Sequence, residues 1–335
     1  MINVTLYTRA DCHLCEQARI DLVELQKKYP HNLILLDIDS DMSLQDQYAF
    51  EIPVVEIGPY RLRYPFSIKD LEMTLAAATD RKTQLERVDD QAYQKAMVRG
   101  RTLTTADKLS LWIARHYLLV INILLLLYVG LPFSAPLLKE VGANGPAELI
   151  YKVYRPLCHQ WSFRSWFLFG EQAYYPHAEA NILGVLTFEQ VSGITDANDP
   201  TRIKARLFEG NEKLGFKVAL CERDIAIWGA ILLFGIIFAL THRKIKGLHW
   251  LVWVVVGIGP IALDGVSQLI SQLNLPVLQL ILPYRESTPF LRTLTGFLFG
   301  FTTAWFGFPT IEEVMADTRR LLTKKFAAIG INKQG

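Results

Sequence analysis

Four long apolar runs constrain the fold of this 335-residue chain more than any other feature. They cover residues 112–133, 224–242, 248–265 and 289–309. A helix needs about 20 mostly apolar residues to cross a bilayer, so each run is long enough to do so. Because all four runs follow residue 110, we expect an α-helical membrane domain of about four spans at 111–310.

Basic residues beside these runs indicate how the chain is oriented in a membrane. They lie before the first run, between the second and third runs, and after the fourth, at Arg99, Arg101, Lys108, Arg115, 242–246 and 319–325. Such residues collect on the cytoplasmic side, so we place all three groups there. Both termini are then cytoplasmic, and the long segment 134–223 lies outside. We therefore expect an integral protein of the cytoplasmic membrane, with the lipid bilayer as a partner.

The segments between and beyond the apolar runs are more polar. Residues 81–110 have alternating charges typical of a solvated linker helix, and 311–335 are expected to form a cytoplasmic amphipathic tail. Residues 149–170 carry too much charge for a span and indicate an extra amphipathic helix at the interface. An insertion at about 171–218 has a soluble composition and is expected to form a lobe on the outer side. Residues 266–284 could form a half-span or a surface helix.

The first 80 residues have a different pattern, in which short apolar strands alternate with amphipathic helices. The expected order is βαβαββα, an α/β domain at 1–80. Cys12 and Cys15 follow the first strand, which places Cys12 at the amino end of the next helix. The unpaired amides and the dipole at that end stabilise a thiolate. Cys15 lies one turn further on, where it can resolve a mixed disulfide.

This order, with Cys-x-x-Cys after the first strand and Ile-Pro-Val before the third, resembles the glutaredoxin branch of the thioredoxin fold. The resemblance implies catalytic roles for Cys12 and Cys15 and a cis Pro53 beside the dithiol. His13, between the two cysteines, would favour the thiolate when charged. Many glutaredoxins have a Gly-Gly turn followed by Asp before the last helix, which contacts glutathione; that turn is absent here, so the sequence gives no support for glutathione. Two alternatives stay open: half of a zinc site, and an inactive thioredoxin fold.

Polar and reactive residues gather where the expected spans meet the outer side. They are Cys158, His159, Gln160, Arg164, Ser165, Cys221, Arg223, Asp224, Asp264, Gln268, Glu286, Ser287 and Arg292. Charges at a membrane edge are costly unless they are paired or solvated, so their convergence from four segments indicates a functional site. We expect pairs between the arginines Arg164, Arg223 and Arg292 and the acids Asp224, Asp264 and Glu286. The alternative is that each charge simply anchors a span at the headgroup level.

The same residues resemble the marks of an uncharacterised family of prokaryotic integral membrane proteins. Those marks are Cys-His-Gln followed by Arg-Ser, and Cys-x-Arg at the start of a span. The resemblance covers about residues 110–310. It implies the cytoplasmic membrane of a prokaryote and these candidate positions, but it supplies no reaction.

Cys158 and Cys221 admit three roles. They could form a reversible disulfide that carries electrons, a metal site, or a structural disulfide that pins the lobe. Cys158, His159 and Cys221 are the candidate metal ligands, with Asp224 or Asp264 beside them, and this set suits zinc, copper or iron. Neighbouring side chains point apart, so an adjacent Cys and His rarely bind the same ion.

The sequence predicts a membrane-anchored thiol–disulfide oxidoreductase whose cytoplasmic Cys-x-x-Cys domain is coupled to the polar residues at the outer end of the spans. Thiol exchange needs contact between sulfurs, yet about 30 Å of bilayer separates the two cysteine pairs. The expected partners are therefore thiol proteins or a membrane redox carrier such as a quinone. The alternative is a transporter, or a metal- or solute-binding protein, with a redox-sensing domain. A net charge of +2 gives no reason to expect a nucleic-acid partner.

Overall fold

The computed structural model describes residues 2–40, 42–87, 98–100, 102–273 and 284–329. The chain forms two compact units. One unit holds Met1–His116 together with Glu313–Gly335, and the other holds Tyr117–Glu312. Parts of the predicted linker helix (88–97 and 101), of the segment 266–284 (274–283) and of the tail (330–335) lie outside the described residues.

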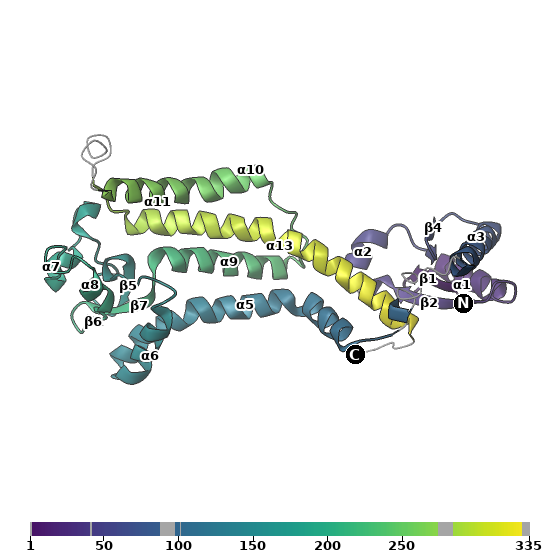
Figure 1. Cartoon of the computed structure of the whole chain (residues 1–335), viewed down its shortest axis with the longest axis horizontal. Helices are drawn as coiled ribbons and strands as arrows, with labels where there is room; N and C mark the ends of the chain where they lie inside the picture. The colour runs from purple at the N-terminus through teal and green to yellow at the C-terminus, as the bar shows by residue number, and fades with distance from the viewer. Residues whose placement is uncertain (1, 41, 88–97, 101, 274–283, 330–335) are drawn as a thin grey trace. The chain divides into compact units, whose positions relative to one another are not determined.

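The amino-terminal domain has the predicted thioredoxin-like order of elements (Figure 1). These elements are β1 (Ile2–Thr8), α1 (His13–Leu25), β2 (His31–Asp37), η1 (Ile38–Ser40), α2 (Met42–Tyr48), β3 (Val54–Ile57), β4 (Tyr60–Arg63) and α3 (Ile68–Arg87). The strands form one mixed sheet in the order β2-β1-β3-β4. β1 pairs with β2 in parallel and with β3 in antiparallel orientation, which confirms the predicted fold.

The core of this domain follows from the period of its apolar residues. On β1, Val4 and Leu6 are fully buried against the helices α1 and α3. On α1, Ala18, Leu22 and Leu25 recur at spacings of four and three, which places them on one face of the helix. Burial of that face against the sheet fixes where α1 begins, and therefore fixes the position of the residues just before it.

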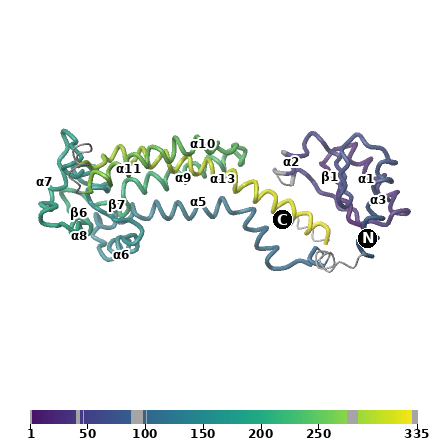
Figure 2. Tube along the Cα trace, turned by 45° about the horizontal axis from the view of Figure 1, so that its top comes forward, coloured from purple at the N-terminus to yellow at the C-terminus, as the bar shows by residue number. Residues whose placement is uncertain are grey.

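The second unit is a helical bundle joined to a small lobe. Its helices are α5 (Thr105–Glu140), α6 (Asn144–Tyr154), α9 (Glu222–Leu240), α10 (Trp250–Val252), the π-helical η4 (Trp253–Ile258), α11 (Gly259–Gln272) and α13 (Pro289–Ala328), although α5 and α13 extend into the first unit. Figures 1 and 2 show α5, α9, α11 and α13 running side by side. α10, η4 and α11 form one continuous helical stretch, so the third predicted span is longer than its apolar run suggested.

Among the described residues, three helical stretches are long and apolar enough to cross a membrane. They are Thr105–Glu140, Glu222–Leu240 and Trp250–Gln272, which correspond to the first three predicted spans. The fourth predicted span, 289–309, lies within α13, a 40-residue helix that is not one of these three. The fourth span therefore stays a prediction.

Small residues let α13 pack closely against its neighbours in the bundle. A Cβ atom at Gly300 would collide with the backbone oxygen of Ile227 on α9, and one at Gly296 would lie 2.9 Å from the backbone oxygen of Arg223. On the other side of α13, a Cβ atom at Gly257 would collide with the hydroxyl of Thr302. Close approach at small residues is typical of helices that associate within lipid. α13 therefore packs as an integral member of the bundle.

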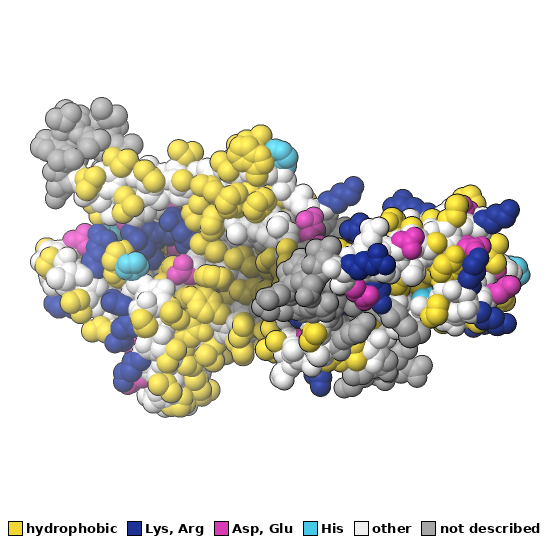
Figure 3. All heavy atoms as spheres, turned by 45° about the vertical axis from the view of Figure 1, so that its right-hand side comes forward, with side chains coloured by type: hydrophobic (Ala, Val, Ile, Leu, Met, Phe, Trp, Pro, Cys, Tyr) yellow, Lys and Arg dark blue, Asp and Glu magenta, His cyan; other side chains and the backbone are white. Residues whose placement is uncertain are grey.

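The outer surface of the bundle is apolar. Leucine and valine side chains are strongly exposed along α5, η4 and α11, including Leu119, Leu124, Val255, Leu263 and Leu269. Figure 3 shows hydrophobic side chains covering much of this surface, with charged side chains gathered at the end that carries the lobe. Exposed apolar area on this scale indicates a binding surface, and together with the length of the helices it indicates lipid.

The segment 149–170 is not one amphipathic helix, so this part of the prediction is wrong. Helix α6 ends at Tyr154, and the chain continues through η2 (Ser162–Arg164) into strand β5 (Ser165–Leu168). Pro156 ends the helix because it has no N–H group and disfavours helical backbone before it. α6 itself buries Tyr151 and exposes Leu149, as expected of a shorter interfacial helix.

The lobe, residues 162–221, has its own small sheet and core. Its remaining elements are η3 (Ala178–Ala180), α7 (Phe188–Ser192), α8 (Ile203–Leu207), β6 (Gly210–Asn211) and β7 (Gly215–Cys221), with strand order β5-β7-β6. Phe163, Phe167, Tyr175 and Phe188 fill its core. Because β7 runs directly into α9, the lobe extends beyond the predicted insertion at 171–218 and carries Cys221 to the start of the second span.

The glycine contact between α9 and α13 generates a prediction. Gly300→Ala places a methyl group against the backbone of α9, so we expect the free energy of unfolding to fall by about 2 kcal/mol. Gly307→Ala, on the same helix with open space around it, should leave stability unchanged or raise it slightly. Unfolding in detergent micelles, followed by circular dichroism, measures both. Equal stability of the two variants would contradict the packing described here.

Candidate functional site

The two cysteines of the amino-terminal domain lie where the sequence predicted. Cys12 is the N-cap residue of α1, and its sulfur accepts a hydrogen bond of 3.2 Å from the backbone N–H of Cys15. The two are joined as a disulfide. Cys15 is buried, Cys12 is partly exposed and His13 is exposed. An incoming thiol can therefore reach Cys12 more easily than Cys15.

Pro53 lies at the same end of the sheet as the disulfide. The Ile52–Pro53 peptide bond is cis, as the resemblance implied. Pro53 directly precedes β3, whose first residue Val54 pairs with Tyr7 near the end of β1. The cysteines follow that same end of β1. The fold therefore brings Cys12, Cys15 and Pro53 to one edge of the domain.

In the second unit, three consecutive charged residues at the start of α9 point to three different groups. Glu222 is fully buried near Arg292, with a separation of 3.9 Å between the charged atoms. Arg223 binds Asp264 on α11. Asp224 lies beside Cys158 and Cys221. Successive residues of a helix point in directions about 100° apart, so the three side chains in one turn of α9 can contact three different groups.

The carboxylate of Glu286 accepts hydrogen bonds from four side chains of the second unit. Arg164 of the lobe donates two hydrogen bonds to it, of 2.7 and 2.9 Å, and Arg292 of α13 donates another. The amides of Gln268 and Gln272 on α11 donate bonds of 2.9 and 3.1 Å. Only 1% of the Glu286 side chain is exposed. One carboxylate thus links the lobe to two helices of the bundle.

The neighbouring arginines affect the pKa of Glu286 more than its burial does. Burial alone would raise the pKa of this carboxyl, but Arg164 and Arg292 hold the pKa below its usual range. Burial and the nearby Arg292 lower the pKa of the Arg164 guanidinium. Glu286 is therefore ionised at neutral pH, and its pairs are charge-assisted hydrogen bonds.

Asp264 is the centre of a second set of contacts. Its carboxylate accepts hydrogen bonds from Arg223, from Arg285 at 2.6 Å and from the Ser287 hydroxyl at 2.7 Å. Arg285 also donates a hydrogen bond of 2.7 Å to the hydroxyl of Ser267. The expected pairing of arginines with Asp264 and Glu286 is present. We call the Glu286 and Asp264 contacts together the polar network; its role as a functional site stays a prediction.

Cys158, Cys221 and Asp224 form a separate group. Their two sulfurs and one carboxylate oxygen all lie within 4.8 Å of one another, and both cysteines are free thiols. A hydrogen bond with Cys158 and burial raise the pKa of the Cys221 thiol well above its usual range. Asp224 thus joins the cysteines rather than one of the arginines.

Three other predicted residues have local structural contacts. His159 is exposed, and its ring lies 5.0 Å from the ring of Trp161, outside the group formed by the two cysteines. The side chain of buried Gln160 donates hydrogen bonds to the backbone oxygens of Tyr151 and Ala219. The Ser165 hydroxyl donates to the backbone oxygen of Trp161. These contacts hold the turn that positions Cys158 and Arg164.

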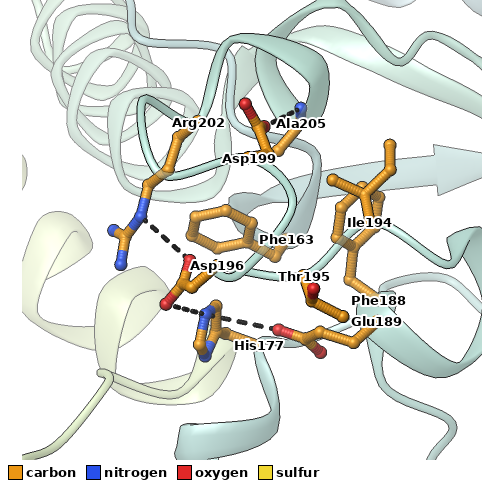
Figure 4. A pocket seen from close by; sticks show the side chains of 10 residues that line it. All are labelled: Phe163, His177, Phe188, Glu189, Ile194, Thr195, Asp196, Asp199, Arg202 and Ala205. Atoms are coloured by element: carbon orange, nitrogen blue, oxygen red, sulfur yellow. Dashed lines mark hydrogen bonds and ion pairs between the residues drawn. The ribbon is translucent and has the colours of Figure 1, made fainter.

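Several residues of these groups were missed by the sequence reasoning. Arg285 and Gln272 extend the polar network, and each has a signal in the sequence: Arg285 adjoins Glu286, and Gln272 lies one helical turn after Gln268. Figure 4 shows a small pocket in the lobe, in which His177 lies 3.3 Å from the carboxylates of both Glu189 and Asp196. Sequence spacing gives no sign of that contact, because the loops of the lobe have no regular period.

Comparison with known proteins matches both parts of the chain. A family model described as a glutaredoxin-like domain (DUF836) matches residues 3–89, and one described as a predicted membrane protein (DUF2085) matches residues 212–306. An uncharacterized protein of Methanocaldococcus jannaschii is 24% identical over 210 residues, which cover 60% of this chain and 96% of that protein. No solved structure matches the chain. The chain therefore joins a glutaredoxin-like domain to a predicted membrane protein domain, as both resemblances indicated.

The Glu286 contacts generate a prediction. Glu286→Gln leaves Arg164 and Arg292 without their carboxylate, and removing one partner of a buried pair costs about 3 kcal/mol or more. Glu148→Gln is the matched control, because Glu148 pairs with Lys152 at 3.7 Å on the exposed side of α6. This variant should lower the free energy of unfolding by less than about 0.5 kcal/mol. Unfolding in detergent measures both. A loss at Glu286 no larger than at Glu148 would show that the polar network is not structural.

Proposed function

We propose that this chain, a glutaredoxin-like domain fused to a membrane domain, is a membrane-anchored thiol–disulfide oxidoreductase. The observation that carries the proposal is the placement of Cys12 as the N-cap of α1, with Cys15 one turn behind it. The partly exposed Cys12 comes first and the buried Cys15 second, in the order that an attacking and a resolving thiol require. The anchor is the helical bundle with its apolar surface.

The proposed reaction exchanges two electrons. The Cys12 thiolate attacks one sulfur of a partner disulfide, the partner's S–S bond breaks, and one partner thiolate leaves. The Cys15 thiolate then attacks Cys12 in the mixed disulfide and releases the second partner thiol. The domain ends as the Cys12–Cys15 disulfide and the partner as a dithiol, and the reverse sequence restores the starting state. The exposed His13 directly follows the attacking cysteine in the sequence, and a positive charge close to Cys12 would favour its thiolate.

The proposal places this chemistry on the cytoplasmic side. The basic loop at 242–246 and the start of α9 lie at opposite ends of a 19-residue helix, about 28 Å apart along its axis, which matches the hydrocarbon thickness. Trp305 of α13 donates a hydrogen bond of 2.9 Å to the backbone oxygen of Lys246, so this part of α13 lies at the basic end. The lobe and the polar network lie at the other end, which we assign to the outside.

The proposal also includes electron transfer between the cytoplasmic and outer sides of the membrane. Direct exchange between Cys12 and Cys221 would require their sulfurs to meet. A membrane-soluble carrier such as a quinone removes that requirement, because a dithiol and a quinone yield a disulfide and a quinol with no electrons or protons left over. Thiol proteins in the cytoplasm are the other partners that the partly exposed Cys12 can reach.

The dithiol chemistry is tested by trapping. In the full-length chain, Cys15→Ser should form stable mixed disulfides through Cys12, because no second thiol resolves them. Cys12→Ser should form none, and its reduction of a small model disulfide should fall to background. Glu24→Ser, an exposed change further along α1, should behave as the wild type. If Cys15→Ser captures no thiol partner and the wild type shows no two-electron transition in a redox titration, the proposal is wrong.

The orientation is tested with single cysteines in a chain whose own four cysteines are replaced by serine. Leu183→Cys reports on the lobe, Lys246→Cys on the basic loop and Glu24→Cys on the amino-terminal domain; all three positions are exposed. A membrane-impermeant maleimide added to intact cells should label only Leu183→Cys. After permeabilisation, it should label all three. Labelling of Lys246→Cys in intact cells would show that the basic loop lies outside and that the proposed orientation is wrong.

A further inference from the structure

The group formed by Cys158, Cys221 and Asp224 is not needed for the dithiol reaction, yet it combines three good metal ligands. Cys158 follows α6 in a tight turn, Cys221 ends β7, and Asp224 lies in the first turn of α9. Their ligand atoms lie within 4.8 Å of one another. Two thiolates bound tetrahedrally to one zinc ion lie about 3.8 Å apart, given Zn–S bonds of about 2.3 Å. Side-chain adjustments of an ångström or less therefore suffice to close the group on one ion.

The charges around this group favour a cation. Among the described residues, Asp224 has no ion-pair partner, while its neighbour Arg223 is bound to Asp264 and Arg292 is bound to Glu286. Asp224 is partly exposed and lies in the first turn of α9, so its carboxylate is available to bind a cation. A metal ion bound there would displace the protons of the two thiols, because thiolates are the forms that ligate metals. A divalent cation would then offset most of the negative charge of the three ligands.

The types of ligand select the class of metal. Thiolates are soft ligands that bind zinc, copper(I) and iron, whereas calcium and magnesium need six or more oxygen ligands. Two thiolates and one carboxylate match zinc, which accepts sulfur and oxygen together in a four-coordinate site. Three protein ligands leave the fourth position for water or a substrate, as in catalytic zinc sites.

The surroundings hold these ligands in place. Cys158 packs in an apolar cluster with Tyr151 and Tyr154, and the Tyr154 hydroxyl donates a hydrogen bond of 2.9 Å to the backbone oxygen of Tyr128 on α5. Gln160 ties the turn after Cys158 to β7 through the backbone oxygen of Ala219. Such second-layer contacts orient ligands and tune affinity for a metal. A disulfide between the two cysteines would leave Asp224 without a role.

We propose that Cys158, Cys221 and Asp224 bind one zinc ion at the lobe end of the bundle, with a fourth position open to solvent or substrate. The sequence offered Cys158, His159 and Cys221 as ligands, with Asp224 or Asp264 beside them; the proposed site keeps the two cysteines and Asp224 and leaves out His159 and Asp264. The site takes no part in the Cys12–Cys15 reaction itself. Zinc bound by Cys158 and Cys221 would exclude direct exchange of Cys221 with Cys12, and it would leave a membrane-soluble carrier or thiol proteins as the partners of that reaction.

The test uses the full-length chain in detergent with Cys12→Ser and Cys15→Ser, so that only Cys158 and Cys221 offer thiols. Elemental analysis after dialysis should find about one zinc per chain. Cobalt(II) in place of zinc should give a thiolate-to-cobalt charge-transfer absorption. This spectrum needs no change to the proposed ligands, so it stays informative even where a ligand variant folds poorly.

Variants then assign the ligands. Cys158→Ser and Cys221→Ser should each weaken zinc binding by more than about 100-fold, and Asp224→Asn by about tenfold or more. His159→Ala is the matched control and should leave affinity unchanged. The absence of a thiolate-to-cobalt band, or a zinc content that survives Cys158→Ser together with Cys221→Ser, overturns the proposal. Loss of zinc in His159→Ala with no loss in Asp224→Asn overturns the ligand set.

Discussion

The buried carboxylate of Glu286 is the interaction on which the second unit depends. It accepts hydrogen bonds from Arg164 in the lobe, from two glutamines on α11 and from Arg292 on α13. Arg164 and Glu286 are 122 residues apart in the chain. The hydrophobic effect does little to bring helices together in lipid, because the surrounding solvent is as apolar as the side chains. Directional, charge-assisted bonds supply the specificity that apolar surfaces lack there.

The amino-terminal domain was predictable because its signals are local. Strand and helix periods, a Cys-x-x-Cys at a helix start and an Ile-Pro-Val sequence each depend on a few neighbouring residues, and together they determine the order of elements and the edge that carries Cys12. The first three spans were predictable for a similar reason, since length and apolarity are local properties. Segment 149–170 was mispredicted because its mixture of charged and apolar residues indicated an amphipathic helix, whereas Pro156 ends the helix early.

The polar groups could be predicted in kind but not in pairing. The sequence shows that arginines and acids meet at one end of the bundle, yet it does not show which arginine meets which acid. That choice depends on helix rotation, which places Arg223 toward α11 and Asp224 toward the cysteines. The pocket around His177 depends on irregular loops and has no periodic signal at all. Local patterns thus predict elements, and only the packed structure assigns partners.

The junction between β7 and α9 has a consequence for how this protein can vary in length. Glu222, Arg223 and Asp224 serve three separate groups from one helical turn, and each residue added or removed ahead of them would rotate all three by about 100°. An insertion of one residue there would uncouple a buried acid, an ion pair and the cysteine group at once. The loop around Leu183, where the side chain is 96% exposed, has no such constraint and can accept extra residues. Relatives of this protein should therefore differ in size within the lobe and keep the same length at its exit.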